Sequence, residues 1–214
     1  MSNIRVYARF PHPATGETTR EKVLRQRVFA IKNHSAMVIG KKVMWPEDWL
    51  AADVAARAPR LFEGDPVLVP VPSSRVTPAD TQWDGEWPSH RLVAALLEHG
   101  VGSQAAHVIR RTTPMRSAKM SRRNQEPRPT IAEHLETLEI RGELPDGPRI
   151  VLVDDVLTRG TQFAACVELL RGAGYRGRVR GFAAAYWTRD TDDIERDYEG
   201  SVSWEDHERA DRNP

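Results

Sequence analysis

Residues Val151–Phe163 have the sequence VLVDDVLTRGTQF, the most informative pattern in this chain. An apolar run is followed by two adjacent acids, and a short turn rich in threonine and glycine then leads into a helical pattern. The stretch therefore predicts a strand, a loop and a helix N-terminus in direct succession. Unpaired backbone N–H groups and the positive end of the helix dipole gather at such a turn, so we expect it to bind phosphate.

The two acids, Asp154 and Asp155, add acceptors for sugar hydroxyls or for a bound cation. Many strand–helix turns carry Asp and Thr simply because these residues cap the helix. Two neighbouring acids at the exit of a buried strand favour a binding site instead, because carboxylates are rarely left there without partners.

Composition restricts the class of protein. The 214 residues fit one domain, and 40% apolar residues can supply its core. No apolar run approaches the roughly 20 residues that span a bilayer, and the N-terminus lacks the apolar core of a signal peptide. The one cysteine, Cys166, is expected in the core and rules out an internal disulfide or a cysteine-rich metal site. We therefore expect a cytoplasmic protein that does not enter the membrane.

The net charge of +1 conceals an uneven distribution of charge. Residues 189–214 are strongly acidic, whereas the segment 110–128 is strongly basic. A basic segment near a phosphate site suggests an anionic substrate, although a solvated loop with ordinary surface charge is the simpler alternative. The cations of this segment are Arg110, Arg111, Arg116, Lys119, Arg122, Arg123 and Arg128.

Strand and helix patterns alternate along the chain, which predicts an α/β fold with a mostly parallel central sheet flanked by helices. Ser89 is the expected N-cap of a helix over 90–99. The other expected helices cover 46–58 and 161–171, and the expected strands cover 5–10 (at an edge), 67–71, 101–109, 149–153 and 179–187.

Ligands of such sheets bind at the carboxyl ends of the strands. Three turns should therefore meet at one edge: Pro72–Arg75, Asp154–Gln162 and the turn after Trp187.

The stretch from Ile150 to Thr158, with Gly160, resembles the phosphoribosyl pyrophosphate (PRPP) signature of the type I phosphoribosyltransferases. Arg159 and Gln162 depart from that signature, which usually has small or hydroxyl residues there. The segments VLVPVPSS (67–74), FAIKNH (29–34) and the basic segment with its surroundings (109–135) are similar to the competence-protein-F-type members of this family. The resemblance covers roughly residues 29–187.

The resemblance implies a type I phosphoribosyltransferase fold with a small hood formed by the termini. Residues 1–30 would be an N-terminal extension or hood, 31–188 the core, and 189–214 an acidic tail. It also implies the residues of the site. PRPP would be bound by Asp154, Asp155, Thr158, Arg159, Gly160, Thr161, Gln162, Ser73, Ser74 and Arg75; Lys119, Arg122 and Arg123 would close over it; Trp187 or Tyr186 would stack on a base.

The implied activity is transfer of a 5-phosphoribosyl group from PRPP to a nitrogenous base or related acceptor, with release of pyrophosphate. Asp154, Asp155, Lys119 and Arg122 would be the catalytic residues, and the two aspartates would hold Mg²⁺ directly or through water. A homodimer would be usual for such a fold. Two alternatives remain open: a non-catalytic sensor of PRPP or nucleotides, motivated by Arg159 and Gln162, and a nucleic-acid-handling protein that uses residues 110–128.

Overall fold

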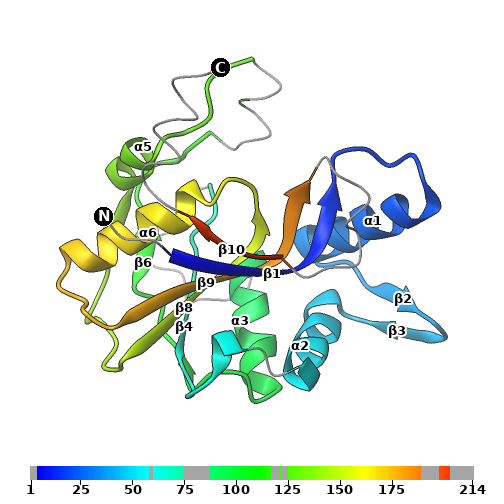
Figure 1. Ribbon diagram of the computed structural model, residues 1–214, viewed down its shortest axis with the longest axis horizontal. Coiled ribbons are helices and arrows are strands. Elements are labelled where there is room, and N and C mark those ends of the chain that lie inside the picture. The colour runs from blue at the N-terminus through cyan, green and yellow to red at the C-terminus, as the bar shows by residue number, and fades with distance from the viewer. Residues whose placement is uncertain are drawn as a thin grey trace.

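The computed structural model describes residues 4–57, 60–74, 87–116, 121, 125–188 and 198–202. Its centre is a six-stranded sheet in the order β10-β1-β9-β8-β4-β5 (Figure 1). Neighbouring strands run parallel, except that β10 is antiparallel to β1. The strands are β1 (Ile4–Pro13), β4 (Val67–Pro70), β5 (Gln104–Ala105), β8 (Arg149–Leu157), β9 (Arg178–Thr188) and β10 (Tyr198–Val202).

Helices cover both faces of this sheet (Figure 1). One face packs against α1 (Thr19–Asn33), α2 (Pro46–Arg57) and α3 (Pro88–Glu98), with the short 3-10 helix η1 (Arg60–Phe62). The other packs against α5 (Ile131–Glu136) and α6 (Thr161–Gly172). Two small antiparallel sheets complete the described structure: β2 (Met37–Ile39) with β3 (Lys42–Met44), and β6 (Ile109–Arg111) with β7 (Leu138–Ile140). The prediction of an α/β fold with a mostly parallel sheet is confirmed.

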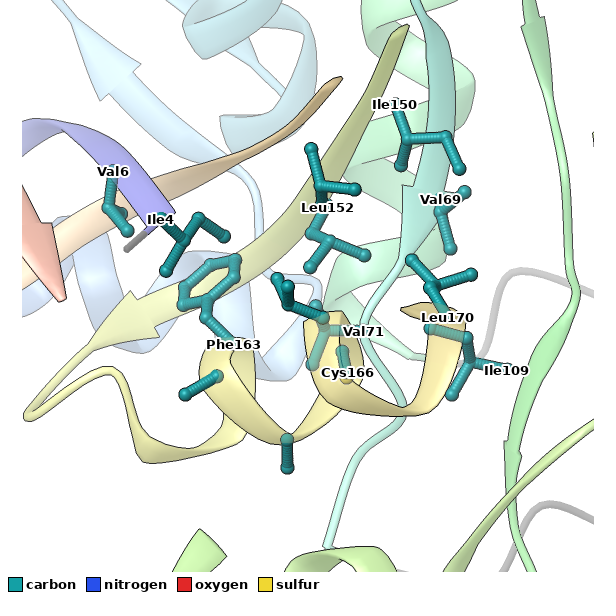
Figure 2. Packing of buried hydrophobic residues seen from close by; sticks show 14 of the residues in the cluster. Ile4, Val6, Val69, Val71, Ile109, Ile150, Leu152, Phe163, Cys166 and Leu170 are labelled. Atoms are coloured by element: carbon teal, nitrogen blue, oxygen red, sulfur yellow. The ribbon is translucent and has the colours of Figure 1, made fainter. Parts of the chain in front are cut away.

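Helix α6 is fixed on the sheet by apolar residues at helical spacing. Phe163, Cys166 and Leu170 are all buried and point toward the strands in Figure 2. Apolar residues of three strands meet them there, among them Ile4 of β1, Leu152 of β8 and Val69 of β4. This packing fixes the direction of α6, and therefore the place of its N-terminus.

The N-terminal region differs most from expectation. The prediction of an edge strand over 5–10 is wrong, because β1 lies inside the sheet between β10 and β9. It buries Ile4, Val6 and Ala8 on one face and pairs in parallel with β9. Residues 4–13 thus belong to the central sheet, and β10, which was assigned to the acidic tail, forms its edge.

Other boundaries also move. The expected strand over 101–109 is two short strands, β5 and β6, and β8 continues four residues beyond Val153. Ser89 is not an N-cap: Trp87 holds that position, and the Ser89 hydroxyl donates to the Val71 carbonyl oxygen at 2.8 Å. That bond ties α3 to the end of β4. Among the described helices, none is both long and apolar enough to span a bilayer.

Candidate active site

A cleft of about 1380 Å³ opens at the carboxyl ends of the parallel strands. Its walls come from the ends of β1, β4, β8 and β9 and from the N-terminus of α6. Two of the three expected turns, the β4 turn and the turn from Asp154 to Gln162, meet here in the described residues. The turn after Trp187 continues into 189–197, which lie outside the described residues, although Trp187 itself lines the cleft. Ser73, Ser74, Asp154, Asp155, Thr158, Gly160, Thr161, Gln162 and Trp187 all line the cleft.

The turn into α6 has an uncapped helix N-terminus. Its N-cap is Gly160, which has a φ of 78° and makes no side-chain capping bond. A Cβ added at Gly160 would lie 2.5 Å from Cγ2 of Val202 in β10, so both the backbone conformation and the packing require glycine. The first amides of a helix have no partner within the helix, and the residues that carry them here, Thr161–Phe163, line the cleft. The turn therefore offers N–H donors to an anion.

The two acids lie side by side in the last residues of β8. The Asp155 backbone N–H donates to Oδ1 of Asp154 at 2.8 Å. Burial, reinforced by the negative charge of Asp155, raises the pKa of Asp154 well above its ordinary range. Nζ of Lys32 in α1 lies 3.5 Å from Oδ2 of Asp155 and partly compensates this charge. A cation or hydroxyl groups at this point would relieve the repulsion between the two carboxylates.

The turn after β4 is held from two sides. Gln162 donates from Nε2 to the Pro72 carbonyl oxygen, so this departure from the family signature links the β4 turn to α6. The Met115 backbone N–H donates to the Ser74 carbonyl oxygen at 2.8 Å. Nε of Arg111 donates to the Ser73 carbonyl oxygen at 2.7 Å.

Arg111 is fully buried, and the sequence analysis did not single it out. Its guanidinium also contacts the Thr137 hydroxyl and lies 3.4 Å from Nδ1 of His134, which lines the cleft. Burial and the nearby Arg111 lower the pKa of His134 to about 4, so His134 is neutral near pH 7 and can accept this bond. Arg111 is thus a positioning residue behind the β4 turn. The sequence marks it only as one cation of a basic segment.

The predicted base-binding pair separates into two environments. Trp187 lines the cleft, and Cζ of Arg128 lies 5.9 Å from its ring centroid. Tyr186 packs against the core on the opposite face, with its ring 5.3 Å from that of Tyr198. Successive residues of a strand point to opposite faces, so only one of the two can face the ligand.

The wall formed by β1 and α1 was not foreseen. His12, Lys22, Arg25 and Lys32 line the cleft there. Nη1 of Arg25 donates to the carbonyl oxygens of Pro13 and Ala14 at 3.1 and 2.9 Å. Burial, together with Lys32 and Arg25, lowers the pKa of His12 to about 4. A usable signal existed only for Lys32, which lies in the FAIKNH segment.

Four predicted site residues, Arg75, Lys119, Arg122 and Arg123, lie outside the described residues. The described cations of the segment 110–128 have internal partners. Arg110 pairs with Glu139, and Nη2 of Arg116 lies 2.7 Å from Oε1 of Glu133. Arg111 is buried, and Arg128 lies over Trp187. Among the described part of this segment, little charge is therefore left for an external polyanion.

The donor set around Asp154 and Asp155 fits a hard divalent cation in part. Among the described residues, no group of three or more His, Cys, Asp or Glu side chains comes together as a metal site. Mg²⁺ commonly takes only one or two protein carboxylates and completes its shell with water and substrate phosphates. The aspartate pair suits that kind of binding.

Fold and cleft together define an α/β protein with a mixed acidic and cation-lined cleft at the carboxyl edge of its sheet. No family model matches the chain, and no curated protein matches it. Among solved structures, it is similar to a hypoxanthine phosphoribosyltransferase from Staphylococcus aureus, with a TM-score of 0.33 and 11% sequence identity. That match covers 65% of this chain and 61% of the other, less than two thirds of its length. A likeness this low identifies neither family nor activity.

Proposed function

We propose that this protein is a phosphoribosyltransferase that transfers the 5-phosphoribosyl group of PRPP to a nitrogen acceptor. One observation supports the proposal above all others. The adjacent carboxylates of Asp154 and Asp155 share a cleft with an uncapped helix N-terminus, and both belong to the same strand–turn–helix stretch. This combination presents acceptors to sugar hydroxyls, and donors to a phosphate six to nine residues further along the chain.

The proposed roles follow the walls of the cleft. The amides of Thr161–Phe163 and the Thr158 hydroxyl bind the 5′-phosphate, and the two aspartates bind the ribose hydroxyls. Ser73 and Ser74 bind the pyrophosphate, because their turn lies beside the aspartates and is braced by Arg111. Trp187 stacks on the acceptor. These groups lie at strand ends, in the turns that follow them or at a helix start, and catalysis here would depend on positioning and charge rather than on a covalent nucleophile.

In the reaction, the bond between C1 of the ribose and the pyrophosphate oxygen breaks as a bond from C1 to the acceptor nitrogen forms. Positive charge develops on the sugar ring, as at other anomeric centres. The ionised aspartates stabilise that charge and hold the ribose in place. Lys32 adds a positive charge beside Asp155, with its Nζ 3.5 Å from Oδ2 of that carboxylate.

Mg²⁺ would be held by Asp154 and Asp155, directly or through water, and when bound it would neutralise charge on the pyrophosphate leaving group. Because burial and Asp155 raise the pKa of Asp154, its carboxyl is more readily protonated than an ordinary aspartate. Binding that requires both carboxylates ionised should therefore strengthen as the pH rises through the pKa of Asp154.

The sensor alternative has one observation in its favour. The side-chain amide of Gln162 donates to the Pro72 carbonyl oxygen. The signature that the sequence resembles usually has a hydroxyl residue at the position of Gln162. A turn fixed in this way can bind PRPP without supporting turnover. Binding and pyrophosphate release are therefore measured separately.

The test is calorimetric titration with PRPP, with and without Mg²⁺, beside ribose 5-phosphate. Pyrophosphate release is then assayed with a panel of nucleobases and small amines. Asp154→Asn with Asp155→Asn should weaken PRPP binding at least about 100-fold, since both ribose and cation contacts are lost. The variant should stay folded, because asparagine removes both the burial of a charge and the repulsion from Asp155, which together raise the pKa of Asp154. Its matched control is Glu143→Gln with Asp146→Asn, which removes two exposed carboxylates from the loop before β8.

Binding of PRPP with release of pyrophosphate would establish the enzyme. Binding without release, across the panel of acceptors, would establish the sensor. Unchanged PRPP affinity in the folded aspartate variant would remove the site assignment.

A further inference from the structure

A second cluster of charge lies at the amino ends of the parallel strands, and the cleft lies at their carboxyl ends. Arg5 of β1, Arg149 of β8, and Arg178 and Arg180 of β9 stand at the amino ends of three neighbouring parallel strands. The register pairs Arg5 with Arg180 and Arg149 with Arg178. Like charges directly opposite one another destabilise a sheet, and here two adjoining ladders each contain such a pair.

Three of these side chains can be placed on one face of the sheet. Phe182 and Val151, two residues beyond Arg180 and Arg149, belong to the core cluster beneath α1, α2 and α3. Side chains two residues apart on a strand share a face, so Arg149, Arg178 and Arg180 project on that side. The loop that starts at η1 crosses there.

That loop holds two of the guanidinium groups in place. Nη1 of Arg180 donates to the Arg60 carbonyl oxygen at 2.9 Å, and Nη1 of Arg149 donates to the Glu63 carbonyl oxygen. A Cβ at Gly64, whose φ is 75°, would lie 2.7 Å from Nη1 of Arg149, so the loop is fitted closely against this side chain. Arg5 and Arg178 are exposed.

The cluster is poor in compensating charge. Burial lowers the pKa of Arg180, and the positive charges of Arg178, Arg149 and Arg5 lower it further. Glu63 is the carboxylate that opposes them. Within the part of the chain that the structure describes, none of the four arginines forms an ion pair with a carboxylate.

We propose that the arginine cluster at the amino ends of β1, β8 and β9 is a binding site for a compact polyphosphate anion. Guanidinium groups match phosphate oxygens in pairs of hydrogen bonds, and such an anion would neutralise the repulsion between the paired arginines. Adjacent strands are about 4.8 Å apart, so three strands carry the cluster across roughly 10 Å. That width suits a di- or triphosphate group, whether free or on a nucleotide, and is short for the extended track that a nucleic-acid strand requires.

The site is separate from the cleft and does not depend on its function. Arg149 and Asp154 lie on the same strand, five residues and therefore roughly 17 Å apart. One polyphosphate group cannot occupy both positions. Binding at the arginine edge should thus persist when the cleft is altered.

The first test is arginine footprinting with phenylglyoxal, read residue by residue by mass spectrometry. Inorganic triphosphate at millimolar concentration should slow modification of Arg5 and Arg178 at least fivefold and leave the exposed Arg141 unchanged. If ATP protects the arginines at a lower concentration than triphosphate does, the ligand is a nucleotide. If triphosphate protects them at the lower concentration, the ligand is inorganic polyphosphate. No protection by either anion overturns the proposal, as does protection by a single-stranded oligonucleotide alone.

The second test uses Arg5→Gln with Arg178→Gln, which keeps the two arginines that hold the loop. Triphosphate should slow amide hydrogen exchange of residues 60–65 in the parent protein. The affinity of the variant for triphosphate should be at least tenfold lower than that of the parent. The control, Lys41→Gln with Lys42→Gln, removes two exposed charges from the β2–β3 hairpin. An equal loss in the control would show attraction by net charge and overturn the site. The arginine variant should unfold no earlier than the parent, because it removes one member of each repelling pair.

Discussion

Two strand–turn–helix units meet at the cleft. In one of them side chains cap the helix N-terminus, and in the other no side chain does. Between β1 and α1, Thr18 and Glu21 form a capping box: the Thr18 hydroxyl accepts from the Glu21 amide at 3.1 Å. Oε2 of Glu21 accepts from the amides of Thr18 and Glu17, each at 2.8 Å. Between β8 and α6, the cap is Gly160, which contributes no side chain.

This contrast determines which of the two turns can bind an anion. A capping box uses the free amides of a helix start within the chain, so α1 has few donors left for a ligand. The uncapped start of α6 keeps its donors available. The α1 side instead contributes the cations Lys22, Arg25 and Lys32 to the same cleft. One unit thus supplies fixed amide donors, and the other supplies side-chain charge.

The largest expected effect is at the uncapped turn. Gly160→Ala forces a non-glycine residue to a φ of 78° and places its Cβ against Val202, at a total cost of about 3 kcal/mol in the free energy of unfolding. Urea unfolding measures this loss. In a Val202→Ala background the same change should cost about 1–2 kcal/mol, because only the backbone strain remains. Equal costs in both backgrounds would show that β10 does not restrict the turn.

An effect of intermediate size is expected from acid at His134 in α5. Its folded-state pKa is about 4 and its ordinary value is 6.5, so it binds fewer protons when folded, and stability is lost as the pH falls from 6.5 toward 4. His134→Gln should remove about 2 kcal/mol of this loss, since glutamine still accepts from Arg111 but does not titrate. Urea unfolding across the pH range gives the slope of the free energy of unfolding against pH. If His134→Gln leaves this slope unchanged, His134 is not a source of the loss of stability in acid.

The capping box should hold through the same pH range. Hydrogen bonds from the backbone amides of Thr18 and Glu17 lower the pKa of Glu21, so this carboxyl stays ionised below its ordinary range. Acid should therefore loosen the β4 turn and α5 before it affects the capping box at the first turn of α1. Amide exchange at pH 5, compared between residues 19–22 and 131–136, distinguishes the two regions.

The smallest effect is expected at the capped turn. Thr18→Ala removes one capping bond and should cost about 1 kcal/mol of stability. Its effect on PRPP affinity should be less than twofold, since the α1 amides are not assigned to the ligand. A large loss of PRPP affinity in a variant of near-normal stability would place the anion on α1 and reverse the comparison.

The sequence predicted best what one contiguous stretch contains. Strand, acids, turn and helix follow one another from Val151 to Phe163, so their order and the helix start at Thr161 needed no distant partner. The burial of Cys166 followed from the same helical spacing. The meeting of the β4 turn with this stretch followed from the general geometry of parallel sheets.

What the sequence did not reveal depends on partners far along the chain. His12 reaches the cleft because β1 pairs with β9, and Arg111 matters because it supports a turn 38 residues earlier. The helix α1 was also missed, although Thr18 and Glu21 have the spacing of a capping box. Its amphipathic pattern is weak, because charged residues lie on most faces of the helix, so the segment was not distinguished from the polar residues that follow β1.

The place of β1 in the sheet sets a time order for synthesis of the protein. Ile4–Pro13 are synthesised before every other strand of the described sheet, whereas their two neighbours, β9 and β10, are the last of its strands to be made. At about 5–20 residues per second, an apolar strand waits on the order of ten seconds or more before it can pair. During that interval Ile4, Val6 and Ala8 are open to chaperones and to other nascent chains. The strand Ile4–Pro13 is thus a segment at which the growing chain is open to misassembly.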